Sequence, residues 1–440
     1  MQTPAVATTL ATLIRFAPVN HGGGRSDGER AIAEWIADQL RAAGWAPLLL
    51  HRAGGRDRLN VVLRVPGADR SLPGLLVHAH TDVVPVEPDQ WTVPPFEGLV
   101  RAGYVYGRGA MDMLGTVAVL VETLVAWGRD GTRPRRDVLF CFVADEEDAG
   151  HWGAEWLVGE HPELFEGIEV AIGEEGGMGE LMPHRDGSTR RVYTIQAGER
   201  GTQHIALTAR GDSGHGSRPT GDDAITRLLH ALVRISDHEW PLAVGDVVRG
   251  QYEGLAAALG FTVDITDEAS MLALVDHLGP LAGPMRWTIR PSATPTVVQA
   301  GYKMNVVPGQ ASAQVDVRCP PGTVDLVDAT LHELIGDGVE WHYLVNGAPL
   351  ASPTSGPWWQ AMCATIMAHD PAAVVVPGCM GGGTDAKAFA TLGITTYGFT
   401  PAPPDASGRF AAGYHGSDER YPVASLVGAQ TMMRHFLATV

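Results

Sequence analysis

Apolar and polar residues follow one another along the chain in two patterns, which predict strands and helices in turn. Short, nearly continuous apolar runs are typical of strands buried on both faces. Such runs occupy residues 59–65, 74–79, 138–144 and 169–172. Segments in which apolar residues recur at helical spacing occupy residues 8–16, 27–44, 114–127 and 358–368. This order predicts an α/β fold in which helices cover a mixed, largely parallel sheet.

The pattern changes from about Val192, where polar and apolar residues alternate as in a half-exposed antiparallel strand. The next elements are an amphipathic helix, two strands and a second helix, at residues 224–235, 294–300, 311–318 and 326–336. Their βαββα order predicts an inserted α+β domain of ferredoxin-like type.

The predicted insertion covers residues 199–351, and the larger domain comprises residues 1–198 and 352–440. A chain of 440 residues is long enough for two domains. Residues 239–292 lie inside the insertion and show helices around glycine and proline breaks. The sequence assigns this segment no function.

The charge balance favours cations as partners. The chain has 50 acidic against 32 basic residues and a net charge of -18, which argues against nucleic acid or an anionic membrane. Its four cysteines show no CxxC spacing, so neither a disulfide framework nor a zinc knuckle is indicated. The N-terminal residues lack a basic segment followed by a long apolar one, so we expect a cytoplasmic location.

The strongest chemical signal is the acidic sequence DEED at residues 145–148, directly after the apolar run 138–144. Neighbouring carboxylates at the end of a buried strand repel unless a cation or a shared proton holds them. The alternative is a solvated acidic turn. Likewise, His80 and Asp82 follow the preceding apolar run, residues 74–79. A carboxylate near a metal-binding imidazole often fixes its tautomer. The alternative is a structural histidine.

Further polar residues fall in loops after strands or before helices of the same predicted sheet. Together with the acidic cluster, they give five positions: His80, Asp112, Glu146 with Glu147, Glu175 and His415. Asp112 precedes a helix, where it could equally be an N-terminal cap. Two imidazoles and three carboxylates are the mixture expected of a site for two divalent ions. The side chains of Glu146 and Glu147 must diverge, so one can bind metal while the other acts as a general base.

Eight motifs in order along the chain carry a family resemblance. They are HTD (80–82), GRGAMDM (107–113), ADEE (144–147), EEGG (174–177), GHGSRP (214–219), NVVPG (305–309), GGTDA (382–386) and HGSDE (415–419). This pattern resembles the di-zinc metallopeptidase and aminoacylase superfamily. The superfamily includes carboxypeptidase S, glutamate carboxypeptidase, aminoacylase, acetylornithine deacetylase and succinyl-diaminopimelate desuccinylase.

The resemblance implies a role for each matching residue. His80 and Glu175 would bind one zinc, Glu147 and His415 the other, and Asp112 would bridge them. Glu146 would be the general base, and Asp82 would orient the histidine. Either Glu174 or Glu175 fits the EEGG motif, and we assign Glu175 because the family motif reads Glu-Gly-Gly. The peptide after Asp112 matches a position where the family often has a cis bond.

The resemblance also implies substrate contacts from the insertion, which serves the family as a lid and dimerisation domain. His215 matches a histidine that polarises the scissile carbonyl, frequently in the partner subunit; the alternative is a surface loop histidine. Asn305 and Arg318 match binders of the substrate carboxylate, although Arg318 could also form a surface salt bridge. The glycine-rich loop supplies four more candidates, Gly382, Gly383, Thr384 and Asp385.

One departure from the family is Leu114, which stands where many members have a lysine that is not a metal ligand. We therefore predict a two-metal hydrolase that cleaves an amide bond beside a free carboxylate, in a dipeptide or short peptide. The first alternative is an N-acyl amino acid deacylase, and the second is a non-catalytic binding module, against which the complete ligand set argues. Zinc is the expected metal, and cobalt or manganese also suit these ligands.

Overall fold

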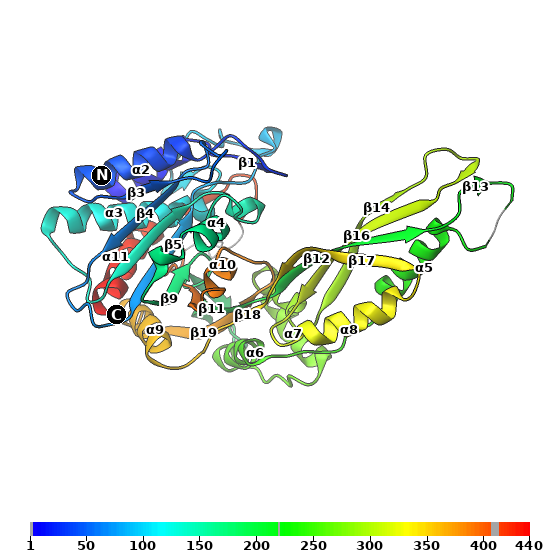
Figure 1. Ribbon diagram of the computed structural model, residues 1–440. Helices are drawn as coiled ribbons and strands as arrows, with labels where there is room; N and C mark the ends of the chain where they lie inside the picture. Colours follow the sequence, from blue (N-terminus) through cyan, green and yellow to red (C-terminus); the bar gives the residue numbers. More distant parts are fainter. Residues whose placement is uncertain (1–2, 219–220, 406–412) are drawn as a thin grey trace.

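A ten-stranded mixed sheet forms the centre of the larger domain in the computed structural model, which describes residues 3–218, 221–405 and 413–440 (Figure 1). Its strands run in the order β10-β11-β20-β9-β5-β8-β4-β3, and β18 and β19 also pair with β11. Their bounds are β3 Leu48–Leu50, β4 Asn60–Val65, β5 Gly74–His80, β8 Val138–Val143, β9 Ile168–Gly173, β10 Gly179–Pro183, β11 Thr189–Glu199, β18 Leu350–Ala351, β19 Ala373–Met380 and β20 Thr395–Gly398. The predicted fold class is confirmed.

The central strands β8, β5, β9 and β20 are parallel, whereas at one side β4 pairs antiparallel with β8 and β3 pairs antiparallel with β4. Strand β5 is buried along its whole length, because helices cover both faces of the sheet. Leu75 and Val77 face one cluster of helices and Leu76 faces the other. The first cluster contains α1 Ala5–Ile14, α2 Arg30–Ala42, α3 Gly115–Asp130 and α11 Val423–Thr439, and the second contains α4 Ala154–Glu160 and α10 Ala386–Ala390.

Helix α3 and the turn before it, Ala110–Asp130, are long and apolar enough to cross a membrane by composition. In the fold, however, 83% of the most apolar window is buried. The hydrophobic side chains of this helix therefore pack against α1, α2 and α11 inside the protein.

The inserted domain extends away from the larger one as a four-stranded antiparallel sheet of order β14-β16-β12-β17 (Figure 1). Its elements are β12 Gly201–Arg210, α5 Ala224–Asp237, β14 Ser292–Ala300, β16 Gln310–Cys319, α8 Val324–Ile335 and β17 Val339–Gly347. Both helices pack on one face of the sheet and share a hydrophobic core with it. The βαββα order expected from the sequence is present and continues into β17, which the sequence analysis missed. We call this sheet and its two helices the lid.

The segment between α5 and β14 was predicted as part of the insertion, but it packs against the larger domain. It contains α6 Asp246–Leu259, α7 Glu268–Leu278 and the 3₁₀ helix η5 Gly279–Trp287. Their buried side chains belong to the core of the larger domain and not to that of the lid. Two glycines let α6 approach β19 closely: a Cβ added at Gly250 would lie 2.9 Å from Pro377, and one at Gly254 2.9 Å from Val376.

Candidate metal centre

Three neighbouring parallel strands end at the same edge of the large sheet, and each delivers an acid or an imidazole there. Strand β5 ends at His80, which pairs in register with Val143, the last residue of β8. Glu146 and Glu147 follow β8 in a short 3₁₀ turn, and Glu174 directly follows β9. Polar residues after parallel strands thus converge, as expected for an open α/β sheet.

Five side chains meet at this edge, and Asp112 lies at their centre. Its Oδ1 is 3.0 Å from Nε2 of His80, and its Oδ2 is 3.1 Å from Nε2 of His415. Glu174 Oε2 lies 3.4 Å from His80 Nε2, and Glu147 Oε1 lies 3.4 Å from His415 Nε2. One carboxylate therefore faces two imidazoles, and each imidazole also faces one further carboxylate. This is the arrangement needed for a pair of cations that share one bridging ligand.

The donor set fits divalent cations. Three overlapping groups of side chains could each hold an ion, because within each group the ligand atoms lie within 4.8 Å of one another. The groups are His80 with Asp112 and Glu174, His80 with Glu146 and Glu147, and Asp112 with Glu147 and His415. Oε1 of Glu147 is buried and has no hydrogen-bond partner among the described residues. Such an oxygen is costly to bury unless something positively charged satisfies it. Histidine nitrogens with carboxylate oxygens are the ligands that zinc and its neighbours in the first transition series accept.

The charges around the two imidazoles of the cluster also favour a bound cation. Burial lowers the pKa of His80, but the surrounding carboxylates outweigh burial and raise that pKa well above its ordinary value. The nearby carboxylates of Asp112 and Glu147 raise the pKa of His415 to about 10. Both imidazoles thus lie in a strongly negative potential that favours a bound positive charge, and a metal ion would compete with the protons there.

The structure changes the assignment of the fourth ligand, which the sequence analysis gave to Glu175. Glu174 approaches His80 and Asp112, and Glu175 belongs to none of the three groups found among the described residues. The reason is the backbone: Glu175 has a φ of +60°, in the left-handed region, so the two side chains diverge. Glu174 is therefore the candidate ligand, and Glu175 faces a cavity beside the centre.

Asp82 also differs in detail from the expectation. Nδ1 of His80 lies 3.0 Å from the backbone carbonyl oxygen of Asp82, whereas the nearer carboxylate oxygen is 3.6 Å away. The carboxylate instead accepts the backbone N–H groups of Glu146 and Glu147, at 3.2 Å each. Asp82 thus orients the imidazole through its backbone and holds the turn with both glutamates through its side chain.

A buried ionic network supports this turn from behind, and the sequence analysis missed it. Arg58 donates to Glu29 at 2.7 Å and to Asp145 at 2.5 Å, and all three side chains are less than a tenth exposed. Asn20 links the network to the centre, since its Nδ2 donates to both Asp145 and Asp82. Burying these groups is tolerable because both acids are bonded to Arg58 and because burial raises the pKa of Glu29 to about 8, which disfavours a second buried negative charge. The network holds Asp145 in place.

The loop with Asp112 is held in a similar way by Glu419. This buried carboxylate accepts the backbone N–H groups of Gly109, Met111 and Asp112 and pairs with Arg108 at 2.6 Å. The peptide bond between Asp112 and the next residue is cis, as the resemblance implied. Glu419 therefore couples the loop of Asp112 to the segment that carries His415.

Glu146 is the candidate general base. Its side chain belongs to a group with His80 and Glu147, and its backbone is fixed by Asp82. Burial raises the pKa of Glu146 well above its ordinary value. A carboxylate with a raised pKa is a better proton acceptor near neutral pH than an exposed one.

The remaining predicted residues lie in two places. His215 and Asn305 lie together at the far tip of the lid, where Gly216 N donates to the Asn305 carbonyl at 2.9 Å; both residues are exposed (Figure 1). Within one chain they are far from the metal centre. Arg318, by contrast, lies at the base of the lid beside the large domain.

The glycine-rich loop only partly matches its expected role. Gly382 lines the cavity near Arg318. The backbone N–H and the hydroxyl of Thr384 both donate to the buried carboxylate of Glu199, so this amide is already used within the protein. Asp385 is buried, and its Oδ2 has no hydrogen-bond partner among the described residues. Gly383 is so close to Lys387 that a Cβ would lie 2.2 Å from Nζ.

Comparison with known proteins identifies the family. Residues 76–439 match the model of peptidase family M20/M25/M40. The chain belongs to this family. The match covers every residue of the candidate centre, from His80 to His415, and the predicted relationship is confirmed.

Two curated proteins and one solved structure illustrate what this chain resembles. It is 30% identical to the N-fatty-acyl-amino acid synthase/hydrolase PM20D1 of Homo sapiens over 77% of this chain and 68% of that protein. It is 28% identical to aminoacylase-1 of Mus musculus over 77% of this chain and 74% of that protein. The structure of an M20 family metallo-carboxypeptidase from Sulfolobus solfataricus aligns with 99% of this chain and 98% of its own, with a TM-score of 0.71 and 17% identity.

Proposed function

We propose that the protein is a two-metal hydrolase that cleaves an amide or peptide bond beside a free carboxylate, as a dipeptidase or carboxypeptidase does. The observation that carries this proposal is Asp112 between His80 and His415, with one more carboxylate at each imidazole. The metal ions would be held by these residues with Glu147 and Glu174. Zinc is the expected ion, and cobalt or manganese also suit the ligands.

Divalent ions bound there would polarise the scissile carbonyl and make an attacking water more acidic. The chain itself supplies the proton transfers. Glu146 takes the proton of the attacking water and returns it to the leaving amine. Asp82 keeps Glu146 in place by accepting its backbone N–H, and the network of Arg58 and Asp145 keeps that turn from moving.

A second candidate is hydrolysis of an N-acyl amino acid, which involves the same chemistry on a different acyl group. The cavity beside the centre favours it, because several methionines contribute to its wall, including Met178, Met182 and Met285. Methionine side chains are flexible and adapt to apolar groups of different shape. The names of an aminoacylase and an N-fatty-acyl-amino acid hydrolase among the relatives agree with this candidate.

A substrate panel tests both candidates. The protein is stripped of metal, reloaded with zinc, cobalt or manganese, and assayed against dipeptides, short peptides and N-acyl amino acids with aliphatic side chains. We expect hydrolysis only in the metal-loaded samples, with about two ions bound per chain. Full activity in the stripped protein would contradict the proposal, and inactivity of every loaded sample would favour a non-catalytic binding module.

We further propose that the protein acts as a homodimer through the lid. His215 and Asn305 lie at the lid tip of their own chain, so they can contribute to catalysis only in a second copy. The lid sheet offers a surface for pairing, since β14 is an edge strand and carries exposed apolar side chains such as Val298. Exposed apolar edge strands are typical sites of strand pairing between chains.

Mixing two inactive variants tests this arrangement. His215→Ala and Glu146→Gln are each expected to be at least about 100-fold less active than the native protein, because they lack the carbonyl-polarising group and the base, respectively. Random co-assembly of equal amounts makes mixed dimers in which one of two sites is intact, so about a quarter of native activity should return. The control mixes Glu146→Gln with Asp82→Ala. Both changes damage the part of the site that each chain supplies to its own metal centre, so both sites of a mixed dimer are damaged and no activity should return. Lack of recovery in the first mixture would place His215 outside the partner's site.

A further inference from the structure

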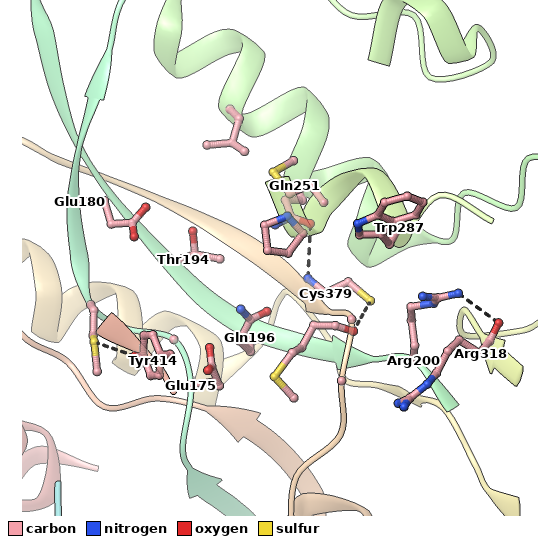
Figure 2. A pocket seen from close by; sticks show the side chains of 18 of the residues that line it. Glu175, Glu180, Thr194, Gln196, Arg200, Gln251, Trp287, Arg318, Cys379 and Tyr414 are labelled. Carbon is pink, nitrogen blue, oxygen red and sulfur yellow. Dashed lines mark hydrogen bonds between the residues drawn. The ribbon is translucent and has the colours of Figure 1, made fainter. Parts of the chain in front are cut away.

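A cavity of about 610 Å³ opens beside the metal centre and runs to the base of the lid (Figure 2). At one end it is lined by Glu175 and Tyr414, the neighbours in sequence of Glu174 and His415. At the other end Arg200 and Arg318 face it, the first from the position between β11 and β12 and the second from β16. Its size is that of a pocket for a small molecule.

The segment of α6 and η5 forms one wall of this cavity. Leu255 of α6 and Met285 and Trp287 of η5 line it, as does Met380 of β19. Gln251 fixes α6 to this strand, since its Oε1 accepts the backbone N–H of Cys379 at 3.3 Å. The part of the predicted insertion that had no assigned function therefore builds an apolar wall beside the centre.

The two arginines at the far end differ in whether an acid within the protein pairs with their guanidinium group. Arg318 donates from Nε and one terminal nitrogen to the carboxylate of Asp316, at 2.7 and 3.1 Å, and its other terminal nitrogen donates to Thr202 Oγ1 at 2.8 Å. Its planar guanidinium is thus already held by an acid in a two-point pair. The positive charge of Arg318 is largely neutralised within the protein.

Arg200 has no such acidic partner in the part of the chain that the structure describes. The residue is only 4% exposed, and one terminal nitrogen of its side chain donates to the carbonyls of Arg290 and Arg318 and to Ser292 Oγ. Among the described residues, Nε of Arg200 is buried without a hydrogen-bond partner, and no carboxylate pairs with this guanidinium. A buried charge without a counter-ion is costly and is rarely retained without a ligand that pairs with it.

We propose that Arg200 is the residue that binds the substrate carboxylate, and that the wall from α6 and η5 receives the apolar side chain next to it. The proposal rests on the function proposed above. The ligand is the carboxylate of an amino acid with an apolar side chain, at the leaving end of a peptide or an N-acyl amino acid. Arg318, held by Asp316, acts behind it as a support at the base of the lid.

Arg200 also has a structural role that any test must separate from binding. It lies between β11 and β12, where the chain passes from the large sheet to the lid, and its bonds tie β12 to the backbone of β16 and of the residues just before β14. Loss of these bonds lowers the rate for every substrate alike. Loss of a carboxylate contact lowers the rate only for substrates that carry the carboxylate.

The test therefore compares N-acetyl-leucine with its uncharged analogue N-acetyl-leucinamide on the metal-loaded protein. We expect Arg200→Met to reduce the preference in kcat/KM for the carboxylate by about 10- to 100-fold, mainly through KM. Arg200→Lys keeps the charge and should retain part of the preference. Ser292→Ala removes a structural partner of Arg200 without changing charge, and it should leave the preference unchanged.

The outcomes separate this inference from the proposed function. If the native protein hydrolyses N-acetyl-leucine and Arg200→Met keeps the native preference for the carboxylate, the proposed role of Arg200 is wrong. The proposed function then still stands. If the preference for the carboxylate disappears in Arg318→Met and persists in Arg200→Met, Arg318 binds the substrate carboxylate and the proposed role of Arg200 is wrong. If the native protein hydrolyses neither these compounds nor any member of the substrate panel, the proposed function itself has failed.

Discussion

Replacement of Glu146 by Gln is expected to lower kcat by about 10²- to 10⁴-fold while the metal content stays at the native level. Gln has the same shape as Glu but cannot take up a proton, so the variant loses the base and keeps the packing. The five candidate ligands, His80, Asp112, Glu147, Glu174 and His415, are all retained. Steady-state kinetics and metal analysis of the same preparation measure both quantities.

The control for this variant is Glu160→Gln, which makes the same change at an exposed position at the end of α4. It should have native kcat and native metal content. If Glu146→Gln keeps a rate within a few-fold of native, the base is another group. If it loses both metal and activity together, Glu146 is a ligand and not the base.

The edge of the sheet with three site positions could be predicted from the sequence. Strands β5, β8 and β9 each appear as an apolar run that ends abruptly in polar residues. Parallel neighbouring strands bring the polar residues at their carboxyl ends to one edge of the sheet, so local patterns were sufficient. Asp112 and His415 lie in other loops of the same predicted sheet, and the mixture of imidazoles and carboxylates predicted that they join this centre; the family resemblance added the role of each.

Other features of the fold depend on which elements pack against one another, and the pattern of apolar and polar residues does not show this. Helix α6 has an apolar face, but its sequence does not say whether that face packs on the lid or on β19. Gly250 and Gly254 decide this, because they allow close contact with the larger sheet. The alternation in residues 339–343 was a visible signal for the missed strand β17, in which less and more exposed residues alternate from Val339 to Leu344.

The missed polar residues gave even weaker signals. Arg200 is one basic residue between two strands, and only its burial without an acid distinguishes it from Arg318. Arg58 pairs with Asp145, 87 positions further along the chain, so no spacing rule connects them. Buried charges are identified by what surrounds them, which a linear pattern does not show.

The choice between Glu174 and Glu175 leads to a second prediction with a large effect. Glu174→Gln is expected to weaken binding of one of the two ions by at least about 100-fold, because loss of a direct ligand should cost more than loss of a supporting hydrogen bond. Activity should fall in parallel and return in part at high metal concentration. Competition with a chromogenic chelator measures the affinity of each site.

Glu175→Gln is the matched control, since it makes the same chemical change one residue away. Burial raises the pKa of Glu175 to about 7, and its side chain faces the cavity instead of His80. We therefore expect native stoichiometry and metal affinity within about tenfold of native, with any kinetic change confined to KM. The reverse result, in which Glu175→Gln loses an ion and Glu174→Gln keeps both, would restore the assignment made from the sequence. It would also require the left-handed turn at Glu175 to rearrange when metal binds.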